Sequence, residues 1–448
     1  MKKLFYWKKN QMITKNVFKI FVLVLFIGSL SNCYASEDSP NDIFNKGLGF
    51  YDKKEYAEAF KYFKLAANQE DKDAQYKLGV MYENGLGLTQ DYAVAVKFYK
   101  LAAEQGQIKA QYNLGVLYTF GRGVSQDYTE AIKYYKLAAD QGHIDAQFNL
   151  GVMYSKGQGV TQNYDEAAKY YKLAADQGDK DAQYKIGFMY EKGIGVIQNY
   201  SVAVKYYKLA ANQGLIDAQF NLGIMYSKGQ GVTQNYDEAT KYYKLAANQG
   251  DKDAQFILGI MYDNGEGVTQ NYEEAAKYYK LAADNGHIIA QYDIGVKYSK
   301  GQGVTQNYGE AVKYFKLAAD QDNSKAQYNL GIMYLNGRGV TQNYGEAVKF
   351  FKLAADQGDS SAQFNLGSMY FNGEGVTQNY EKAAKYYKLA ADQGDKDAQY
   401  NLGVMYYKGL GVTQNYDEAV KYYKLAAEQG DLQSKKQLEK IQNLKNSN

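Results

Sequence analysis

The dipeptide Ala-Gln recurs at a fixed interval of 36 residues through most of this chain. No insertion or deletion breaks the interval, and the alanines of the ten copies are Ala74, Ala110, Ala146, Ala182, Ala218, Ala254, Ala290, Ala326, Ala362 and Ala398. A strict period of this length is typical of a solenoid, in which each repeat buries its apolar surface against its neighbours. The spacing therefore predicts one elongated array, although 448 residues alone would suggest several domains.

Each repeat has the pattern of a helix, a turn and a second helix. In the last repeat Ala398, Leu402 and Met405 fall on one face of a helix, and a Gly-x-Gly turn follows them. In three repeats the second helix is preceded by an Asn with a Glu three residues later, at Asn163 and Glu166, Asn235 and Glu238, and Asn271 and Glu274. We expect these pairs to form reciprocal capping boxes at the start of the second helix.

A glycine lies inside the first helix of every repeat, directly after the Leu or Ile of the apolar face, as Gly403 does after Leu402. A glycine inside a helix costs about 1 kcal/mol relative to alanine. Ten such glycines are sustainable only if they allow close helix packing that returns more free energy than is lost. We therefore expect close packing here; the alternative is a flexible hinge in every repeat.

The combined pattern, A-x-x-x-L-G-x-x-Y-x-x-G-x-G-V followed by A-x-x-Y-Y-x-x-A-A-x-x-G, resembles the Sel1-like repeat, a relative of the tetratricopeptide repeat. In the last repeat the matching residues are Ala398, Leu402, Gly403, Tyr406, Gly409, Gly411, Val412, Ala419, Tyr422, Tyr423, Ala426, Ala427 and Gly430. The resemblance covers nearly all of the chain after about residue 43. It implies an all-α fold, a right-handed α-solenoid of stacked repeats, that binds other proteins and catalyses nothing. Many bacterial members of the family are exported.

Residues 1–35 are predicted to be a signal peptide. Six lysines precede an apolar run at 20–30, which is too short for a membrane span of about 20 residues. The translation start is either Met1 or Met12. Cleavage after Ala35 would release a periplasmic or secreted protein. Alternatively, the sequence ending at Cys33 resembles a lipoprotein box, which would give an outer-membrane lipoprotein, or the segment stays uncleaved as an anchor.

The rest of the chain is predicted to comprise a linker at 36–41, an atypical first repeat at 42–70, ten repeats at 71–430, and a capping helix with a tail at 431–448. In the first repeat Phe50 corresponds to Tyr82, an offset of 82 − 50 = 32, so its turn lacks four of the usual 36 residues. At the other end Glu439 stands at the position of the packing glycine. A charge there suits a terminal repeat without a further neighbour.

Several classes of chemistry are disfavoured. Removal of 1–35 takes away six Lys and no acidic residue, so the formal charge changes from +3 to −3, which argues against nucleic acid as a partner. The Gly-x-Gly turns follow helices and lack a nucleotide-binding context. His143 and His287 lie four repeats apart, where we interpret them as loop residues after a glycine. We therefore expect no enzyme activity, no catalytic residue, no cofactor and no metal site.

A partner-binding surface is predicted on the first helices. The residue before the core Leu lies off the packing face, and in six repeats it is an Asn: Asn113, Asn149, Asn221, Asn329, Asn365 and Asn401. Seven residues later, on the same face, three of these repeats carry Lys156, Lys228 and Lys408. An Asn amide both donates to and accepts from a peptide backbone, and Lys attracts a carboxylate. Tetratricopeptide proteins that grip peptides use Asn at this position, so the resemblance implies a protein partner, held through an extended acidic segment.

Two other functions stay open. Some secreted family members with disulfides are linked to β-lactam binding, which would imply an enzyme acting on β-lactams or murein, but this chain lacks their paired cysteines. A structural spacer tethered to the membrane, for example by lipidation of Cys33, is the other alternative.

The signal-peptide analysis makes a prediction about processing. The mature protein should begin at Ser36 and contain neither Trp nor Cys, because Trp7 and Cys33 are the only residues of their types. Intact mass spectrometry of the protein from its native host tests this. A diacylglyceryl adduct on Cys33 would show lipoprotein processing instead.

Overall fold

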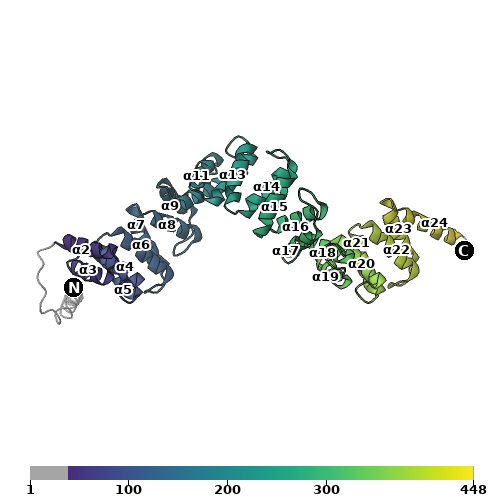
Figure 1. The fold of residues 1–448 in the computed structure, drawn as a ribbon, viewed down its shortest axis with the longest axis horizontal. Helices are drawn as coiled ribbons and strands as arrows, with labels where there is room; N and C mark the ends of the chain where they lie inside the picture. Colours follow the sequence, from purple (N-terminus) through teal and green to yellow (C-terminus); the bar gives the residue numbers. More distant parts are fainter. Residues whose placement is uncertain (1–38, 447–448) are drawn as a thin grey trace, which may run out of the picture. The chain divides into compact units, whose positions relative to one another are not determined.

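The computed structural model describes residues 39–446, and the regular structure in this range is helical throughout, with 23 helices, α2 to α24 (Figure 1). The predicted signal peptide, Cys33 and the beginning of the predicted linker lie outside the described residues. The chain divides into two compact halves, one ending at Tyr170 and the other beginning at Tyr171, inside helix α9. No helix in the described range has the length and apolar character needed to cross a membrane.

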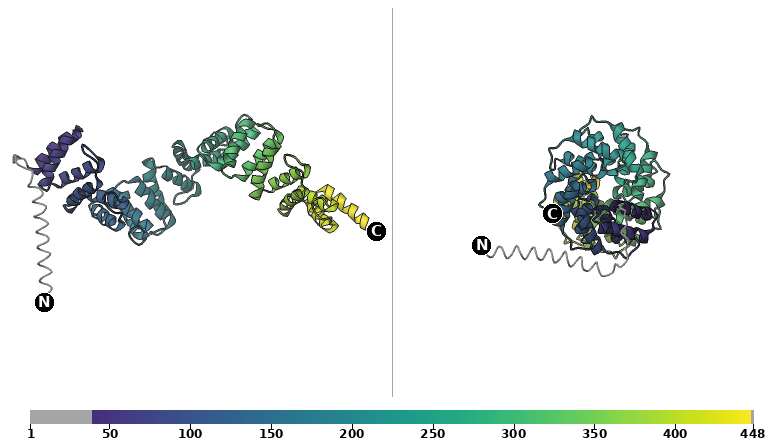
Figure 2. Two further views of the ribbon diagram at one scale, coloured as in Figure 1. Left: turned by 90° about the horizontal axis from the view of Figure 1, so that it is seen from below. Right: turned by 90° about the vertical axis from the view of Figure 1, so that its left-hand side faces the viewer.

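Two kinds of helix alternate along the chain. The A helices are the first of each repeat: α2 (Pro40–Asp52), α4 (Lys72–Asn84), α6 (Ile108–Phe120), α8 (Ile144–Lys156), α10 (Lys180–Lys192), α12 (Ile216–Lys228), α14 (Lys252–Asn264), α16 (Ile288–Lys300), α18 (Ser324–Asn336), α20 (Ser360–Asn372), α22 (Lys396–Lys408) and α24 (Leu432–Asn446). The B helices are the second: α3 (Tyr56–Asn68), α5 (Tyr92–Glu104), α7 (Tyr128–Asp140), α9 (Tyr164–Asp176), α11 (Tyr200–Asn212), α13 (Tyr236–Asn248), α15 (Tyr272–Asp284), α17 (Tyr308–Ala319), α19 (Tyr344–Asp356), α21 (Tyr380–Asp392) and α23 (Tyr416–Glu428). Within each half, an A helix packs on the B helix that follows, and that B helix packs on the next A helix (Figures 1 and 2). The predicted all-α solenoid of stacked helix pairs is confirmed.

The helix ends follow the sequence signals in part. Gly409 adopts a left-handed conformation with φ of 70° at the end of α22, as its position predicts. At the start of α13 the Asn235 side chain accepts from the Glu238 amide, but the Asn235 amide donates to the Tyr226 carbonyl, 2.9 Å away. The prediction of a reciprocal capping box is therefore wrong for this pair, because the backbone of the preceding A helix already satisfies the amide that Glu238 would accept. Glu238 pairs with Lys241 instead.

The start of α2 differs from the predicted boundary. Ser39 caps this helix and forms a reciprocal capping box with Asp42, and Pro40 occupies the first helical position. The helix therefore begins inside the stretch at 36–41 that the sequence analysis interprets as a linker.

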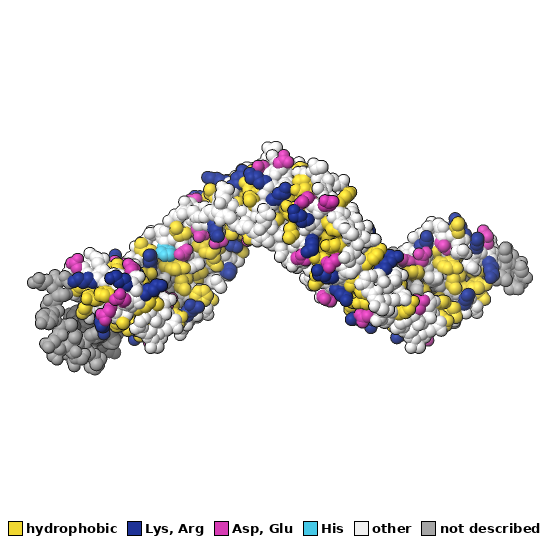
Figure 3. Space-filling view, viewed as in Figure 1, with side chains coloured by type: hydrophobic (Ala, Val, Ile, Leu, Met, Phe, Trp, Pro, Cys, Tyr) yellow, Lys and Arg dark blue, Asp and Glu magenta, His cyan; other side chains and the backbone are white. Residues whose placement is uncertain are grey.

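The B helices are not buried on every apolar side. Tyr422 of α23 is buried, as expected for a helix between two neighbours, whereas Leu425 is 38% exposed. The corresponding leucines of the other B helices are exposed to a similar degree. Hydrophobic side chains thus reach the surface between charged residues, as on the face drawn in Figure 3.

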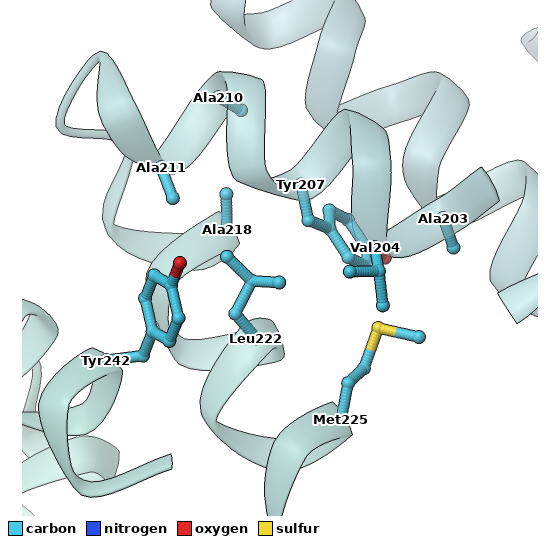
Figure 4. Packing of buried hydrophobic residues seen from close by; sticks show 9 residues of the cluster. All are labelled: Ala203, Val204, Tyr207, Ala210, Ala211, Ala218, Leu222, Met225 and Tyr242. Carbon is cyan, nitrogen blue, oxygen red and sulfur yellow. The ribbon is translucent and has the colours of Figure 1, made fainter. Parts of the chain in front are cut away.

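The core is built where an A helix meets aromatic side chains. Around α12, for example, Leu222 and Met225 are buried together with Tyr207 of α11 and Tyr242 of α13 (Figure 4). The glycine of the A helix allows the closest approach: a Cβ atom added to Gly331 would lie 2.5 Å from the Phe351 ring. The predicted role of these glycines in close packing is confirmed.

The Gln of the Ala-Gln pair links three helices. Gln327 of α18 is only 1% exposed. Its Nε2 donates to the Ala319 carbonyl at the end of α17, 3.2 Å away, and its Oε1 accepts from Gln357 Nε2 after α19, 2.8 Å away. The Gln327 amide thus satisfies a buried carbonyl of the preceding repeat, and its own oxygen is satisfied by a side chain at the end of its own repeat.

One junction in the second half is charged. Lys297 of α16 stands where the A helices α4 to α14 and α18 to α22 carry Met or Leu. It is 4% exposed, and its Nζ lies 2.6 Å from Asp263 Oδ1 of α14 and 5.3 Å from the centroid of the Tyr279 ring. Asp293, half-buried near this pair, has its pKa raised to about 6, mainly by burial.

The close approach at the A-helix glycine predicts a loss of stability when a methyl group is added. Gly331→Ala should destabilise its junction by about 1–3 kcal/mol, because the Phe351 ring must move. Gly49→Ala in α2 is the matched control, since nothing lies within 4 Å of its Cβ position, and it should be neutral or stabilising by up to about 1 kcal/mol. Hydrogen exchange of residues 324–356 measures the effect. Equal responses to both changes, or a loss spread along the whole chain, would contradict close packing at Gly331.

The charged junction predicts opposite effects for replacing the whole ion pair and for removing one partner. The double change Lys297→Met and Asp263→Ser installs the residue types that α8 carries at these two positions, and it should leave the stability of α16 unchanged or raise it by about 1–4 kcal/mol. Asp263→Ala alone leaves a buried ammonium without its carboxylate and should cost about 3–5 kcal/mol. Hydrogen exchange of residues 288–300 checks both variants, and faster exchange in the double variant would show that the ion pair is a net source of stability.

Candidate partner-binding groove

A groove of about 690 Å³ lies between two consecutive A helices of the first half, α6 and α8. Part of its lining comes from α6 and the turn after it, part from α7, and part from α8 and the turn after that: Tyr112, Val116, Thr119, Phe120 and Gln126; Tyr128 and Tyr135; and Asn149, Val152, Met153, Lys156 and Gln158. The groove therefore combines an aromatic floor, aliphatic walls, amides and one cation.

The floor and one rim are held by internal hydrogen bonds. Tyr135 is buried, its hydroxyl lies 3.1 Å from Thr119 Oγ1, and burial raises its pKa to about 12, so it is a neutral group at physiological pH. Gln126 Nε2 donates to the Thr119 carbonyl at 2.8 Å and to the Tyr128 hydroxyl at 3.0 Å. These bonds fix the turn after α6 and leave the groove open beside it.

The outer end of the groove is apolar and cationic. Phe120 ends α6 and is 63% exposed, and the guanidinium of Arg122 lies 5.6 Å from the centroid of its ring. Lys156 ends α8 and is exposed, and within the described range no carboxylate forms an ion pair with it. An apolar side chain and a neighbouring carboxylate on a partner would both find a complement here.

The structure brings one predicted pair together in this groove, Asn149 and Lys156. Asn149 is half-buried, and its amide lies close enough to the hydroxyls of Tyr112 and Tyr135 to lower the pKa of each. It therefore faces the repeat before it as well as the groove. This second role is not visible in the sequence, because the two tyrosines lie 37 and 14 positions earlier.

The remaining predicted residues lie at equivalent places on other A helices. The asparagines are half-buried and the lysines are exposed: Asn113, Asn221, Asn329, Asn365, Asn401, Lys228 and Lys408. Several of the amides are already engaged. Asn113 Nδ2 donates to the Tyr99 hydroxyl at 3.0 Å, and Asn329 and Asn365 each donate to a carbonyl of their own helix at 2.8 Å.

Phe120 is a groove residue that was not predicted from the sequence. A signal for Phe120 was present, because the equivalent position in the A helices α4 and α8 to α22 is always Asn or Lys. A departure from the repeat pattern at an exposed position thus marks the groove better than the recurring Asn does.

In the part of the chain that the structure describes, no three or more His, Cys, Asp or Glu side chains gather to hold a metal ion.

Comparisons with known proteins identify the family. The Sel1 repeat model matches eleven consecutive segments, at 42–71, 72–107, 108–143, 144–179, 180–215, 216–251, 252–287, 288–323, 324–359, 360–395 and 396–431. The crystal structure of c5321, a protective antigen of uropathogenic Escherichia coli strains displaying an SLR fold, is 35% identical with a TM-score of 0.72, covering 92% of this chain and 89% of that one.

Two further relatives are more distant or shorter. A Sel1 repeat protein from Oxalobacter formigenes is 30% identical with a TM-score of 0.53, covering 69% of this chain and 90% of that one. A curated relative, the ERAD-associated E3 ubiquitin-protein ligase component HRD3B of Arabidopsis thaliana, is 45% identical over 49 residues, which are 11% of this chain and 8% of that protein. The repeats and the structural relatives agree: this chain belongs to the Sel1 repeat family.

Proposed function

We propose that this protein is an exported, non-catalytic scaffold that binds partner proteins through its A helices, with the α6–α8 groove as a principal site. A Sel1 repeat solenoid is a protein-interaction scaffold, which supports the general class. The apolar run at 20–30, preceded by lysines, supports export to the periplasm or the exterior. Lipidation of Cys33 would in addition tether the protein to a membrane.

The observation that carries this proposal is that the exposed Phe120 and the cation Lys156 line the same groove. A phenylalanine that is 63% exposed at the mouth of a groove gains free energy when a partner covers it. Lys156 adds an exposed charge without a carboxylate partner in the described range. The groove therefore fits a segment with an apolar side chain next to an Asp, a Glu or a terminal carboxylate.

The backbone of such a segment also finds partners. The half-buried Asn149 and the rim residue Gln158 carry amides, which both donate to and accept from a peptide group. Stacked helices are on the order of 10 Å across, and an extended chain advances about 3.3 Å per residue. Crossing from one A helix to the next would therefore take about three residues of the partner.

The surface charges favour a protein partner over nucleic acid. On the face drawn in Figure 3, Lys and Arg side chains are mixed with Asp and Glu, with no broad field of one sign. Nucleic-acid binding depends on clustered Lys and Arg that displace counterions from phosphates. A local cation beside apolar walls suits a short acidic peptide segment better.

The proposal predicts which surface changes abolish partner capture. The immobilised full-length protein should capture a partner from an extract of its host, to be identified by mass spectrometry. Lys156→Glu and Phe120→Ala should each weaken capture about tenfold or more, because they remove the charge complement and the apolar anchor.

Lys300→Glu is the matched control, since Lys300 occupies the position of Lys156 on α16 and lies outside the groove. Circular dichroism should show unchanged helix content in all three variants. Capture that survives Lys156→Glu and Phe120→Ala but is lost when an exposed B-helix leucine such as Leu137 becomes Asp would place the binding surface on the B helices instead.

A further inference from the structure

His143 and His287 cap A helices with a nitrogen lone pair. The Nδ1 atom of His143 accepts from the Ala146 amide of α8 at 3.4 Å, and that of His287 accepts from the Ala290 amide of α16 at 3.1 Å. Most other A helices use a carboxylate or an amide oxygen for this bond, as Asp179 does for α10. Only a neutral imidazole has a free acceptor, and a cation is also unfavourable at the positive end of a helix. These two caps therefore depend on the protonation state of the ring.

His143 contacts a residue that lines the α6–α8 groove. It precedes α8, and its ring stacks on Tyr112 of α6, with 4.5 Å between centroids and 14° between planes. Tyr112 and Asn149 both line the groove. The ring that caps α8 is thus in direct contact with a residue of the groove.

The two histidines share a geometry but differ in the ion pair that protonation would complete. Burial lowers the pKa of His143; Asp145 of its own helix opposes this shift, and Lys109 of α6 adds to it. Burial also lowers the pKa of His287. There Asp253 occupies the place of Lys109, with its Oδ1 atom 3.6 Å from Nε2, and it raises the pKa, whereas the adjacent Lys252 lowers it.

The sign of the pH effect follows from these directions. A histidine whose folded pKa lies below its unfolded value binds fewer protons when folded, so its contribution to stability is present above about pH 6.5 and is lost as the pH falls. Protonation of His287 is partly offset by an ion pair with Asp253. Protonation of His143 is favoured by Asp145 and opposed by Lys109, and within the described residues no carboxylate forms an ion pair with its ring.

We propose that the α6–α8 groove is acid-gated: protonation of His143 removes the cap of α8, loosens its first turn against α6, and releases a bound partner segment in mildly acidic conditions. Only the release step of this inference rests on the proposed function. The loosening of α8 is a property of the unbound protein and is tested without a partner. The α14–α16 junction, capped by His287, is the built-in comparison that resists acid.

Hydrogen exchange of the full-length protein at pH 7.5 and pH 5.5, corrected for intrinsic rates, tests the loosening. Residues 144–150 should exchange about five- to tenfold faster at pH 5.5 than at pH 7.5, as expected for loss of a helix cap, whereas residues 288–294 should change less. His143→Asp, which installs the cap of the other repeats, should abolish the response. Asp293 also titrates near pH 6, but its raised pKa makes its protonation stabilising, so it cannot mimic the effect.

Charge exchange between the two junctions sharpens the test and does not touch either cap. Lys109→Asp should make residues 144–150 resistant to acid, and Asp253→Lys should make residues 288–294 sensitive. An acid response that is absent, or that persists in His143→Asp and Lys109→Asp, overturns the proposal.

Partner release is measured separately. A partner captured at pH 7.5 should elute at pH 5.5 from the wild-type protein and stay bound to His143→Asp. Equal retention by both proteins at pH 5.5 overturns the gating, whereas failure of Lys156→Glu to weaken capture at pH 7.5 would refute the groove as the binding site.

Discussion

The array depends on the contact between a glycine of each A helix and an aromatic ring of the B helix that follows. A side chain as small as a methyl group at Gly331 would lie 2.5 Å from the Phe351 ring, so the ring packs directly on the helix backbone. This approach buries the ring and fixes how the two helices of a repeat cross. Glycine weakens an isolated helix by about 1 kcal/mol, and only the tertiary contact makes it favourable. Helix propensity and packing are therefore in conflict at this position, and packing prevails.

A second constraint joins one repeat to the next. Buried side chains such as Gln327 bond backward to a carbonyl of the preceding repeat and forward to the end of their own repeat. In a linear array each repeat contacts only its neighbours, so a change at one junction stays local. The same framework can therefore hold an apolar junction at Met333, a buried ion pair at Lys297 and an open groove beside Phe120 without altering the repeats between them.

Much of the fold could be predicted from the sequence because its determinants are close together in the chain. The period, the apolar face of each helix and the glycine that ends an A helix at Gly409 all lie within one repeat. The contacts that could not be predicted join residues about 14 to 37 positions apart, as between Asn149 and its two tyrosines. Helical periodicity says which residues share a face, but not which atom of the neighbouring repeat they meet. The reciprocal capping box failed for a related reason: the Tyr226 carbonyl lies only nine positions before Asn235 but belongs to the other helix of the repeat, and periodicity within one helix does not reveal it.

The candidate site was predicted only in part, because a residue that recurs in every repeat can serve the packing of the repeats rather than a binding site. The recurring Asn residues lie on the A helices, yet several of their amides are engaged in bonds to a tyrosine hydroxyl or to their own helix, so recurrence reflects the framework. A residue that departs from its ten-fold pattern serves one place in the array, as Lys297 serves one junction. Phe120 replaces a polar residue at an exposed position of the groove, and His143 replaces an oxygen acceptor at the cap of α8 and stacks on the groove residue Tyr112. Because both departures concern one groove, we propose that this groove, rather than the repeated surface as a whole, is the site for a particular partner.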